Sequence, residues 1–201
     1  MTKGNIRIEL DELYKRYTQT FENEQVVLGE GCTDSPLVIV GEAPGKDEVT
    51  QGKPFVGAAG KNLKEFMDLI GLTRESVYIT NVIKYRLGKL NEKTRRIINR
   101  PATKNDIINS QQWLHNELLL LCPKLIVTLG NVPLKAVTNN FELSIGDMHG
   151  TLHTCRIGEN TYKLFPLYHP ASIIYNRGLK EIYNKDILLL REVLGGLQAL
   201  T

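Results

Sequence analysis

The chain has 201 residues, a formal net charge of +3 and a pI near 8.7. That length suits one domain with a substantial core, and the mildly basic balance fits nucleic acid as readily as a metabolic substrate. Its three cysteines form no CxxC pair, which argues against a disulfide framework and a cysteine-rich metal site. The sequence has no long apolar span and no signal-peptide core. We expect a single domain over residues 1–201, monomeric and cytoplasmic, with no metal and no membrane contact.

Helical and strand patterns alternate along the chain. Apolar residues at helical spacing predict a helix at the N-terminus, from about Ile8 to Phe21. Later helices are expected at residues 58–70, 105–121 and 179–194. Short apolar runs predict strands at residues 37–40, 76–80, 125–129 and 162–168. This alternation favours an α/β fold, which we expect to be a three-layer α/β/α sandwich around a mostly parallel, four-stranded sheet.

A glycine-rich loop follows the first predicted strand. It runs from Gly41 to Gly57 and holds Glu42, Glu48 and the aromatic residue Phe55. Open α/β sheets bind ligands in the crevice beyond the carboxyl ends of their strands. Glycines let backbone N–H groups approach a flat ligand, and an aromatic ring offers a stacking face. The loop therefore predicts a ligand site; the alternatives are that Phe55 packs into the core and that the carboxylates cap the next helix.

Two common phosphate-binding motifs are absent from this loop. No GK[ST] follows the glycines at the spacing of a P-loop, and the run from Gly41 to Gly45 lacks the G-x-G-x-x-G register of dinucleotide-binding proteins. Both omissions argue against nucleotide binding of the usual kinds.

Polar residues follow the ends of three predicted strands, namely Glu42, Asn81 and His169. Because the carboxyl ends of parallel strands lie at one edge of a sheet, we expect these residues to converge. An asparagine amide can read the edge of an amide-like ring, and a histidine can donate to a developing oxyanion. Glu42 and Glu48 can orient water or stabilise positive charge on a sugar. The alternatives are a turn residue at Asn81 and a structural histidine at position 169.

A polar, basic segment runs from Lys84 to Lys104 with little apolar accompaniment. Such a segment can contact phosphates, and the alternative is a solvated loop.

Five sequence blocks, in matching order, resemble one family. The runs 41–48 and 52–60 closely resemble the first motif of the uracil-DNA glycosylase superfamily, and its bacterial and archaeal family four branch is the most similar. The remaining blocks of that branch are matched by residues 78–84, 99–103, 123–130 and 168–172. The resemblance covers roughly residues 30 to 190.

This resemblance implies excision of uracil from DNA by base flipping and hydrolysis of the N-glycosidic bond. By position, Phe55 would stack on the base, Asn81 would read its edge, and His169 would stabilise negative charge on the leaving uracil. Backbone N–H groups near Glu42 and Ala43 would complete the pocket, and Glu42 and Glu48 match acidic positions implicated in catalysis. The DNA-binding residues by this comparison are Lys84, Arg86, Arg100, Ser172 and Arg177.

The chain departs from the family four pattern in two main respects. That branch holds an iron–sulfur cluster on four cysteines, and the corresponding positions here are Tyr14, Tyr17, Tyr85 and Ser110. Such clusters normally need thiolates, so we expect no cofactor and aromatic packing in its place. In addition, about ten residues rich in Lys and Arg are inserted between Arg86 and Asn99.

Two alternatives to a uracil glycosylase stay open. One is a glycosylase for hypoxanthine, xanthine or a mismatched thymine, and the other is a DNA-binding homologue without catalysis. The joint presence of Glu42, Asn81 and His169 argues against the latter, because a pure binding protein needs none of them. No lysine is placed in the pocket for a Schiff-base step, which indicates a monofunctional enzyme in DNA repair.

Overall fold

The structure, a computed structural model, describes residues 3–176 and 178–198. Its central sheet has the strand order β1-β3-β2-β6-β8-β7. The four middle strands are parallel to one another: β3 (Tyr78–Asn81), β2 (Leu37–Gly41), β6 (Leu125–Leu129) and β8 (Asn160–Leu167). The expected α/β fold with a mostly parallel sheet is confirmed.

The expected number of four strands was wrong, because the sheet has six. The two additional strands, β1 (Glu30–Gly31) and β7 (His153–Ile157), pair antiparallel at the two edges. β1 is two residues long and contains no large apolar side chain. β7 buries only alternate residues, Cys155 and Ile157, so neither strand shows the continuous apolar run of a strand covered on both faces.

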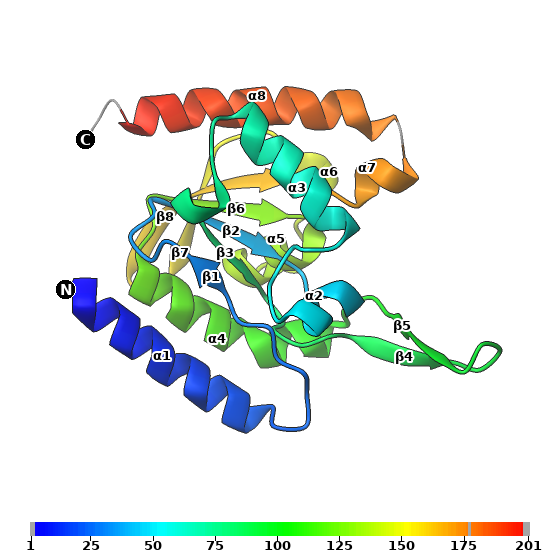
Figure 1. Ribbon diagram of the computed structural model, residues 1–201. Coiled ribbons are helices and arrows are strands. Elements are labelled where there is room, and N and C mark those ends of the chain that lie inside the picture. The colour runs from blue at the N-terminus through cyan, green and yellow to red at the C-terminus, as the bar shows by residue number, and fades with distance from the viewer. Residues whose placement is uncertain (1–2, 177, 199–201) are drawn as a thin grey trace.

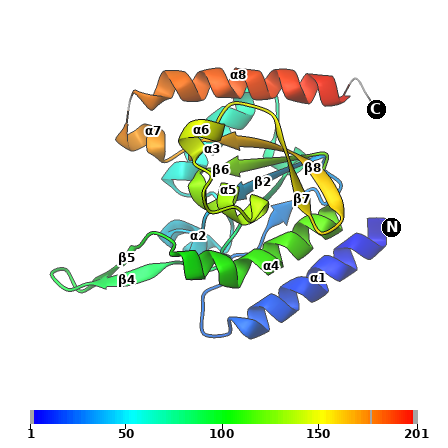
Figure 2. The same ribbon diagram turned by 180° about the vertical axis from the view of Figure 1, so that it is seen from behind.

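Helices cover both faces of this sheet (Figures 1 and 2). One face packs against α1 (Lys3–Thr20), α4 (Lys104–Leu121) and α5 (Asn131–Thr138). The other packs against α3 (Ala58–Leu69) and α8 (Leu179–Gln198). Successive residues of β2 point to opposite sides, so its alternate side chains belong to two separate cores. Together these elements form the expected three layers.

Short elements surround the carboxyl edge of the sheet, where the arrows of the parallel strands end in Figure 1. α2 (Lys46–Gln51) and α7 (Ser172–Tyr175) lie there. Two further single turns are α6 (Ile145–Met148) and η1 (Arg74–Ser76), and η1 precedes β3 and so lies at the opposite, amino edge. The basic segment is an antiparallel hairpin of β4 (Gly88–Asn91) and β5 (Arg96–Asn99) that projects from the body. Among the described residues, no helix is long and apolar enough to cross a membrane.

Candidate active site

A cavity of about 460 Å³ opens beyond the carboxyl ends of the parallel strands. Among the residues that line it are Ala43, Glu48, Phe55, Asn81 and His169. A smaller cavity of about 160 Å³ adjoins it and is lined by Glu42 together with Ala43 and His169. The polar residues at the carboxyl ends of β2, β3 and β8 therefore converge, as the parallel strand order predicts.

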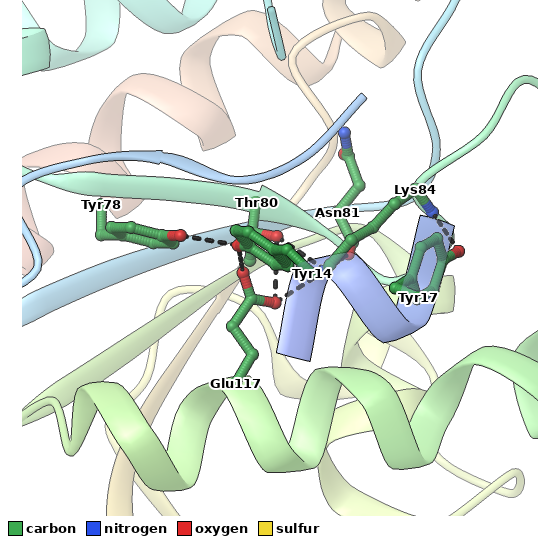
Figure 3. A network of polar contacts seen from close by, with 7 residues as sticks. All are labelled: Tyr14, Tyr17, Tyr78, Thr80, Asn81, Lys84 and Glu117. Atoms are coloured by element: carbon green, nitrogen blue, oxygen red, sulfur yellow. Dashed lines mark hydrogen bonds and ion pairs between the residues drawn. The ribbon is translucent and has the colours of Figure 1, made fainter. Parts of the chain in front are cut away.

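Asn81 ends β3 and lies opposite Gly41 in the sheet register, with only 3% of its surface exposed. A Cβ atom at Gly41 would lie 2.4 Å from Asn81 Oδ1 and 2.5 Å from Phe55 Cζ. Only a glycine at this position lets both side chains occupy the cavity wall. Figure 3 shows the Asn81 amide pointing away from the buried polar contacts on the other side of the strand. Its donor and acceptor groups are thus directed to the cavity.

Phe55 adopts a left-handed backbone conformation with φ of 52°, which is uncommon for a bulky residue. Arg74 stabilises this turn, because its Nη1 donates to the Phe55 carbonyl at 3.2 Å and its Nη2 donates to the Pro54 carbonyl. The same guanidinium forms an ion pair with Glu30 at 2.7 Å. The Phe55 ring then lies 6.1 Å from the His169 ring, with 29° between their planes.

Glu48 holds the glycine-rich loop together. Its carboxylate accepts the backbone N–H groups of Gly45 at 3.1 Å, Val56 at 3.1 Å and Gly57 at 2.8 Å. Gly45 and Gly57 are the N-caps of α2 and α3, so one negative charge lies at the N-termini of two helices. Most of the acceptor capacity of this carboxylate is therefore used by the loop.

His169 lies two residues after the end of β8, in the turn before α7. Its Nδ1 accepts the backbone N–H of Ala171 at 3.1 Å, so the neutral ring carries its proton on Nε2. Burial lowers the pKa of His169 to about 4, against the smaller opposing effect of the nearby Glu48 charge. Pro170, the next residue, is fixed by a hydrogen bond of 2.8 Å from Asn62 of α3 to its carbonyl. At neutral pH this histidine is an uncharged hydrogen-bond donor.

Glu42 follows β2 and accepts the backbone N–H of Ala102 at 3.2 Å. Burial raises the pKa of its carboxyl group, and this hydrogen bond partly opposes the rise. Of the two loop glutamates, Glu42 therefore keeps more free acceptor capacity, since Glu48 serves three backbone amides.

A family model, that of the uracil DNA glycosylase superfamily, matches the sequence over residues 28–189. The chain belongs to this superfamily. It is 36% identical over 172 residues to the type-4 uracil-DNA glycosylase of Sulfurisphaera tokodaii, covering 83% of this chain and 74% of the relative. The type-4 uracil-DNA glycosylase of Archaeoglobus fulgidus is 37% identical over 172 residues, covering 84% and 82%. That of Thermotoga maritima is 34% identical over 164 residues, covering 81% and 79%.

One residue that the superfamily resemblance placed on DNA is buried instead. The Lys84 side chain is 1% exposed and forms an ion pair of 2.7 Å with Glu117 of α4, which is fully buried. Lys84 Nζ also donates to the Asn81 backbone carbonyl at 2.9 Å (Figure 3). The expectation that Lys84 contacts DNA does not agree with this placement, because the buried carboxylate of Glu117 holds the side chain inside the protein.

Of the other expected DNA-binding residues, Arg100 lines the smaller cavity. Arg100 makes two hydrogen bonds to Asp106, at 2.7 and 3.0 Å, which hold the pKa of that carboxyl far below its usual range. Arg86 donates to Asn99 Oδ1 at 2.8 Å. Ser172 begins α7 and is half-buried, and Arg177 lies outside the described residues.

Two site residues were missed by the sequence analysis. Asn99 lines both cavities, and its place at the start of a family block was an available signal. Arg74 acts on the loop from a separate turn, and no local pattern marks it.

The four positions that the family four resemblance pairs with cluster-binding cysteines, Tyr14, Tyr17, Tyr85 and Ser110, carry no thiol. Tyr17 packs against Phe21 at 4.5 Å and against Trp113 at 5.4 Å, and Phe21 in turn packs against Tyr85 at 5.0 Å. Ser110 Oγ is buried beside these rings. In the part of the chain that the structure describes, no group of three or more His, Cys, Asp or Glu side chains could hold a metal ion. This donor set does not fit an iron–sulfur cluster.

Tyr14, at the fourth of these positions, makes polar contacts instead of aromatic ones. Its hydroxyl donates to Glu117 Oε1 and lies 2.6 Å from the hydroxyl of Tyr78 on β3. Burial and the Glu117 charge raise the pKa of Tyr14 well above its ordinary value. Helix α1 is thus joined through Glu117 to the strand that carries Asn81 (Figure 3).

Proposed function

We propose that this chain is a monofunctional uracil-DNA glycosylase, which flips uracil out of DNA and hydrolyses its N-glycosidic bond. The observation that carries the proposal is the convergence of an amide, an aromatic ring and a neutral histidine, from Asn81, Phe55 and His169, on one cavity. The similarity to type-4 uracil-DNA glycosylases supports the same substrate.

Recognition of the base rests on complementary edges. Uracil presents an alternating series of carbonyl acceptors and an N–H donor, and the Asn81 amide supplies one donor and one acceptor at matching separation. Phe55 offers its ring face to the flat base, and the backbone beside Ala43 closes the cavity. Since unstacking a base costs a few kcal/mol, these contacts must recover that free energy.

Departure of uracil needs stabilisation of a growing negative charge. The Nε2–H of His169 is the donor for this task, because Nδ1 is occupied by the Ala171 N–H and the ring is neutral. A fixed donor in a water-poor site requires no reorganisation during the reaction. Removing one such donor typically lowers kcat by about 10²–10³.

The two glutamates have different parts in this proposal. Glu42 orients the attacking water or stabilises the positive charge that develops on the deoxyribose, because its carboxylate faces the smaller cavity beside His169. Glu48 positions the loop that carries Phe55 through its three backbone hydrogen bonds. It is a positioning residue, and its exchange acts through loop geometry.

The enzyme in this proposal works as a monomeric, cytoplasmic, single domain over residues 1–201 and without an iron–sulfur cluster. The donors at Tyr14, Tyr17, Tyr85 and Ser110 support the last point, since none is a thiolate. Metal and acid-labile sulfide analysis of protein purified without oxygen tests it. Four equivalents of iron per chain would overturn this part of the proposal.

Uracil release from oligonucleotides with a single uracil, single- and double-stranded, tests the function itself. We expect release by the wild type, and a loss of about 10²-fold or more in both Asn81→Ala and His169→Ala. Substrates with hypoxanthine, xanthine or a mismatched thymine are tested in parallel. Release of one of these bases in place of uracil would contradict the proposed specificity, and release of none would contradict an enzymatic function.

A further inference from the structure

Residues 86–100, which include the insertion between Arg86 and Asn99, form a cationic arm, here termed the basic hairpin. Its strands β4 and β5 are paired from Gly88↔Asn99 to Asn91↔Arg96. The turn is well defined, because Asn91 Oδ1 accepts the N–H groups of Lys93 at 3.0 Å and Thr94 at 3.1 Å. The hairpin has a single carboxylate, that of Glu92, and six cationic side chains: Arg86, Lys89, Lys93, Arg95, Arg96 and Arg100.

The base of the basic hairpin is part of the cavity wall. Asn99, the last residue of β5, lines both cavities. Arg86 fastens this end by donating to Asn99 Oδ1 at 2.8 Å and to the Ile97 carbonyl at 3.1 Å. The buried Leu87 accepts the N–H of Arg100 at 2.9 Å. The arm therefore starts at the site and extends away from it into solvent (Figure 1).

One face of the hairpin is apolar and uncovered. Leu90 and Ile97 are cross-strand partners and are 53% and 61% exposed. Alternate residues of a strand share a face, so this pair lies on the same side as Asn99, the residue that lines the cavity. A Cβ atom at Gly88 would lie 2.7 Å from Ile97 Cγ2, so this glycine leaves room for the isoleucine. Two-stranded hairpins are marginal by themselves, which makes an uncovered apolar face costly unless a partner covers it.

We propose that the basic hairpin is a DNA-contacting arm that holds the strand beside the extruded nucleotide. Lys89, Lys93, Arg95 and Arg96 contact phosphates, and the pair Leu90 and Ile97 packs against the bases or sugars next to the flipped position. The inference rests on the proposed function for the location of the flipped nucleotide. DNA fits better than a second copy of this chain, because two arms of the same strong positive charge repel each other whereas phosphates neutralise them. Apolar side chains in contact with unstacked bases are a common way to stabilise deformed DNA.

The phosphate contacts are tested with the fourfold variant Lys89→Gln, Lys93→Gln, Arg95→Gln and Arg96→Gln. The control variant removes the same number of positive charges from exposed residues elsewhere on the protein. Two lie in α1, one directly before β6 and one in β7: Arg7→Gln, Lys15→Gln, Lys124→Gln and Arg156→Gln. Binding to a uracil-free duplex is measured by fluorescence anisotropy between 50 and about 200 mM salt. The plot of log Kd against log salt should lose about 0.9 in slope for each phosphate contact removed in the hairpin variant. The control variant should keep most of the wild-type slope.

The apolar pair is tested with the double variant Leu90→Ser and Ile97→Ser. We expect a several-fold higher KM for uracil release from a long duplex with an unchanged salt slope. Release from a uracil trinucleotide, too short to reach the hairpin, should be unchanged. Circular dichroism melting of each variant checks that the body of the protein stays folded.

Equal salt slopes and affinities in the hairpin variant and its control would overturn the inference. A second result would also overturn it: the wild type self-associates, and the Leu90/Ile97 variant no longer does so but binds DNA as tightly as the wild type. The apolar face would then be a contact between copies of the chain. Failure of the proposed function is separable from both results. In that case the wild type releases no uracil, and binding to uracil-free DNA still reports on the hairpin.

Discussion

The Nζ atom of Lys84 lies 2.7 Å from the Oε2 atom of Glu117, and both side chains are almost fully excluded from solvent. The ammonium also donates to Thr80 Oγ1 and to the Asn81 carbonyl, each at 2.9 Å. The ion pair therefore joins α4 to the end of β3, where the residue that we propose to read the base is located. Replacing a whole buried ion pair by apolar residues is often neutral for stability, whereas removing one partner is strongly destabilising.

Replacing Lys84 by Met should destabilise the fold strongly. The substitution leaves Glu117 buried without a counter-charge, and breaking such a pair typically costs about 3–5 kcal/mol. Urea unfolding of wild type and variant measures the difference. The double variant Lys84→Met/Glu117→Gln should recover much of it, because no uncompensated charge then remains.

The matched control is Lys64→Met on the surface of α3. Lys64 pairs with Asp68 one turn away, and the two side chains are 72% and 57% exposed. Exposed pairs contribute roughly 0–1 kcal/mol, so this variant should be close to wild type in stability. Equal losses in Lys64→Met and Lys84→Met would contradict the importance of the buried pair.

His169 should make stability depend on pH in the acidic range. Burial lowers its folded pKa to about 4, compared with 6.5 for an ordinary histidine. Between these two pH values the unfolded chain binds the proton and the folded protein does not. The contribution of neutral His169 to the free energy of unfolding is therefore complete above pH 6.5 and is lost as the pH falls towards 4. For a shift of this size it amounts to about 3 kcal/mol.

NMR titration of the His169 ring protons, with unfolding measured at several pH values, checks this expectation. His169→Gln should show a flatter decline of stability between pH 6.5 and 4 than the wild type. Titration of His169 near 6.5 would mean that the ring is charged at mildly acidic pH and would contradict its proposed role as a neutral donor.

Glu42 and Glu48 should respond in opposite directions when each is changed to Gln. Burial raises the folded pKa of Glu42, so its contribution to stability is lost as the pH rises through that pKa. Glu42→Gln should therefore raise the melting temperature at pH 7.5, with a gain that vanishes in acid, while uracil release falls about 10²–10⁴-fold. Glu48→Gln weakens three charge-assisted hydrogen bonds at two helix N-termini and should lower the melting temperature at the same pH.

Thermal unfolding at pH 7.5 distinguishes the two glutamates by the sign of the change in melting temperature, and a second measurement at pH 4 checks that the Glu42→Gln gain vanishes in acid. A lower melting temperature of Glu42→Gln at pH 7.5 would show that the ionised carboxylate stabilises the fold, contrary to the prediction.

Strongly local patterns allowed much of this fold to be predicted. The four parallel strands contain short, buried and largely apolar runs, such as Leu125–Leu129, and the main helices begin and end within a few residues of the predicted limits. The edge strands β1 and β7 were not predicted, because a short or half-buried strand is defined by its pairing partner rather than by its own sequence. The strands of the basic hairpin were not predicted for the same reason, since the residues of β4 and β5 are mostly exposed.

The candidate site was predictable where residues directly follow strands, as at Asn81 and His169. It was not predictable where the function of a side chain depends on a distant partner. Lys84 looks like a solvated lysine of a basic segment until Glu117, 33 positions later, is placed beside it. Likewise, the sequence does not show that the Glu48 carboxylate accepts hydrogen bonds from three backbone N–H groups of its own loop.

Arg74 should affect base binding without touching the base. Its guanidinium holds the carbonyls of Pro54 and Phe55 and is itself held by Glu30, so it maintains the left-handed turn that presents the Phe55 ring. Arg74→Met should weaken inhibition by free uracil and raise KM roughly tenfold, corresponding to about 1.4 kcal/mol. Arg74→Lys should not rescue binding, because a single ammonium cannot replace the planar fork that reaches both carbonyls and the carboxylate. A variant with a lowered melting temperature but unchanged uracil inhibition would show that Arg74 only stabilises the fold, and a substantial rescue by lysine would show that charge alone is sufficient.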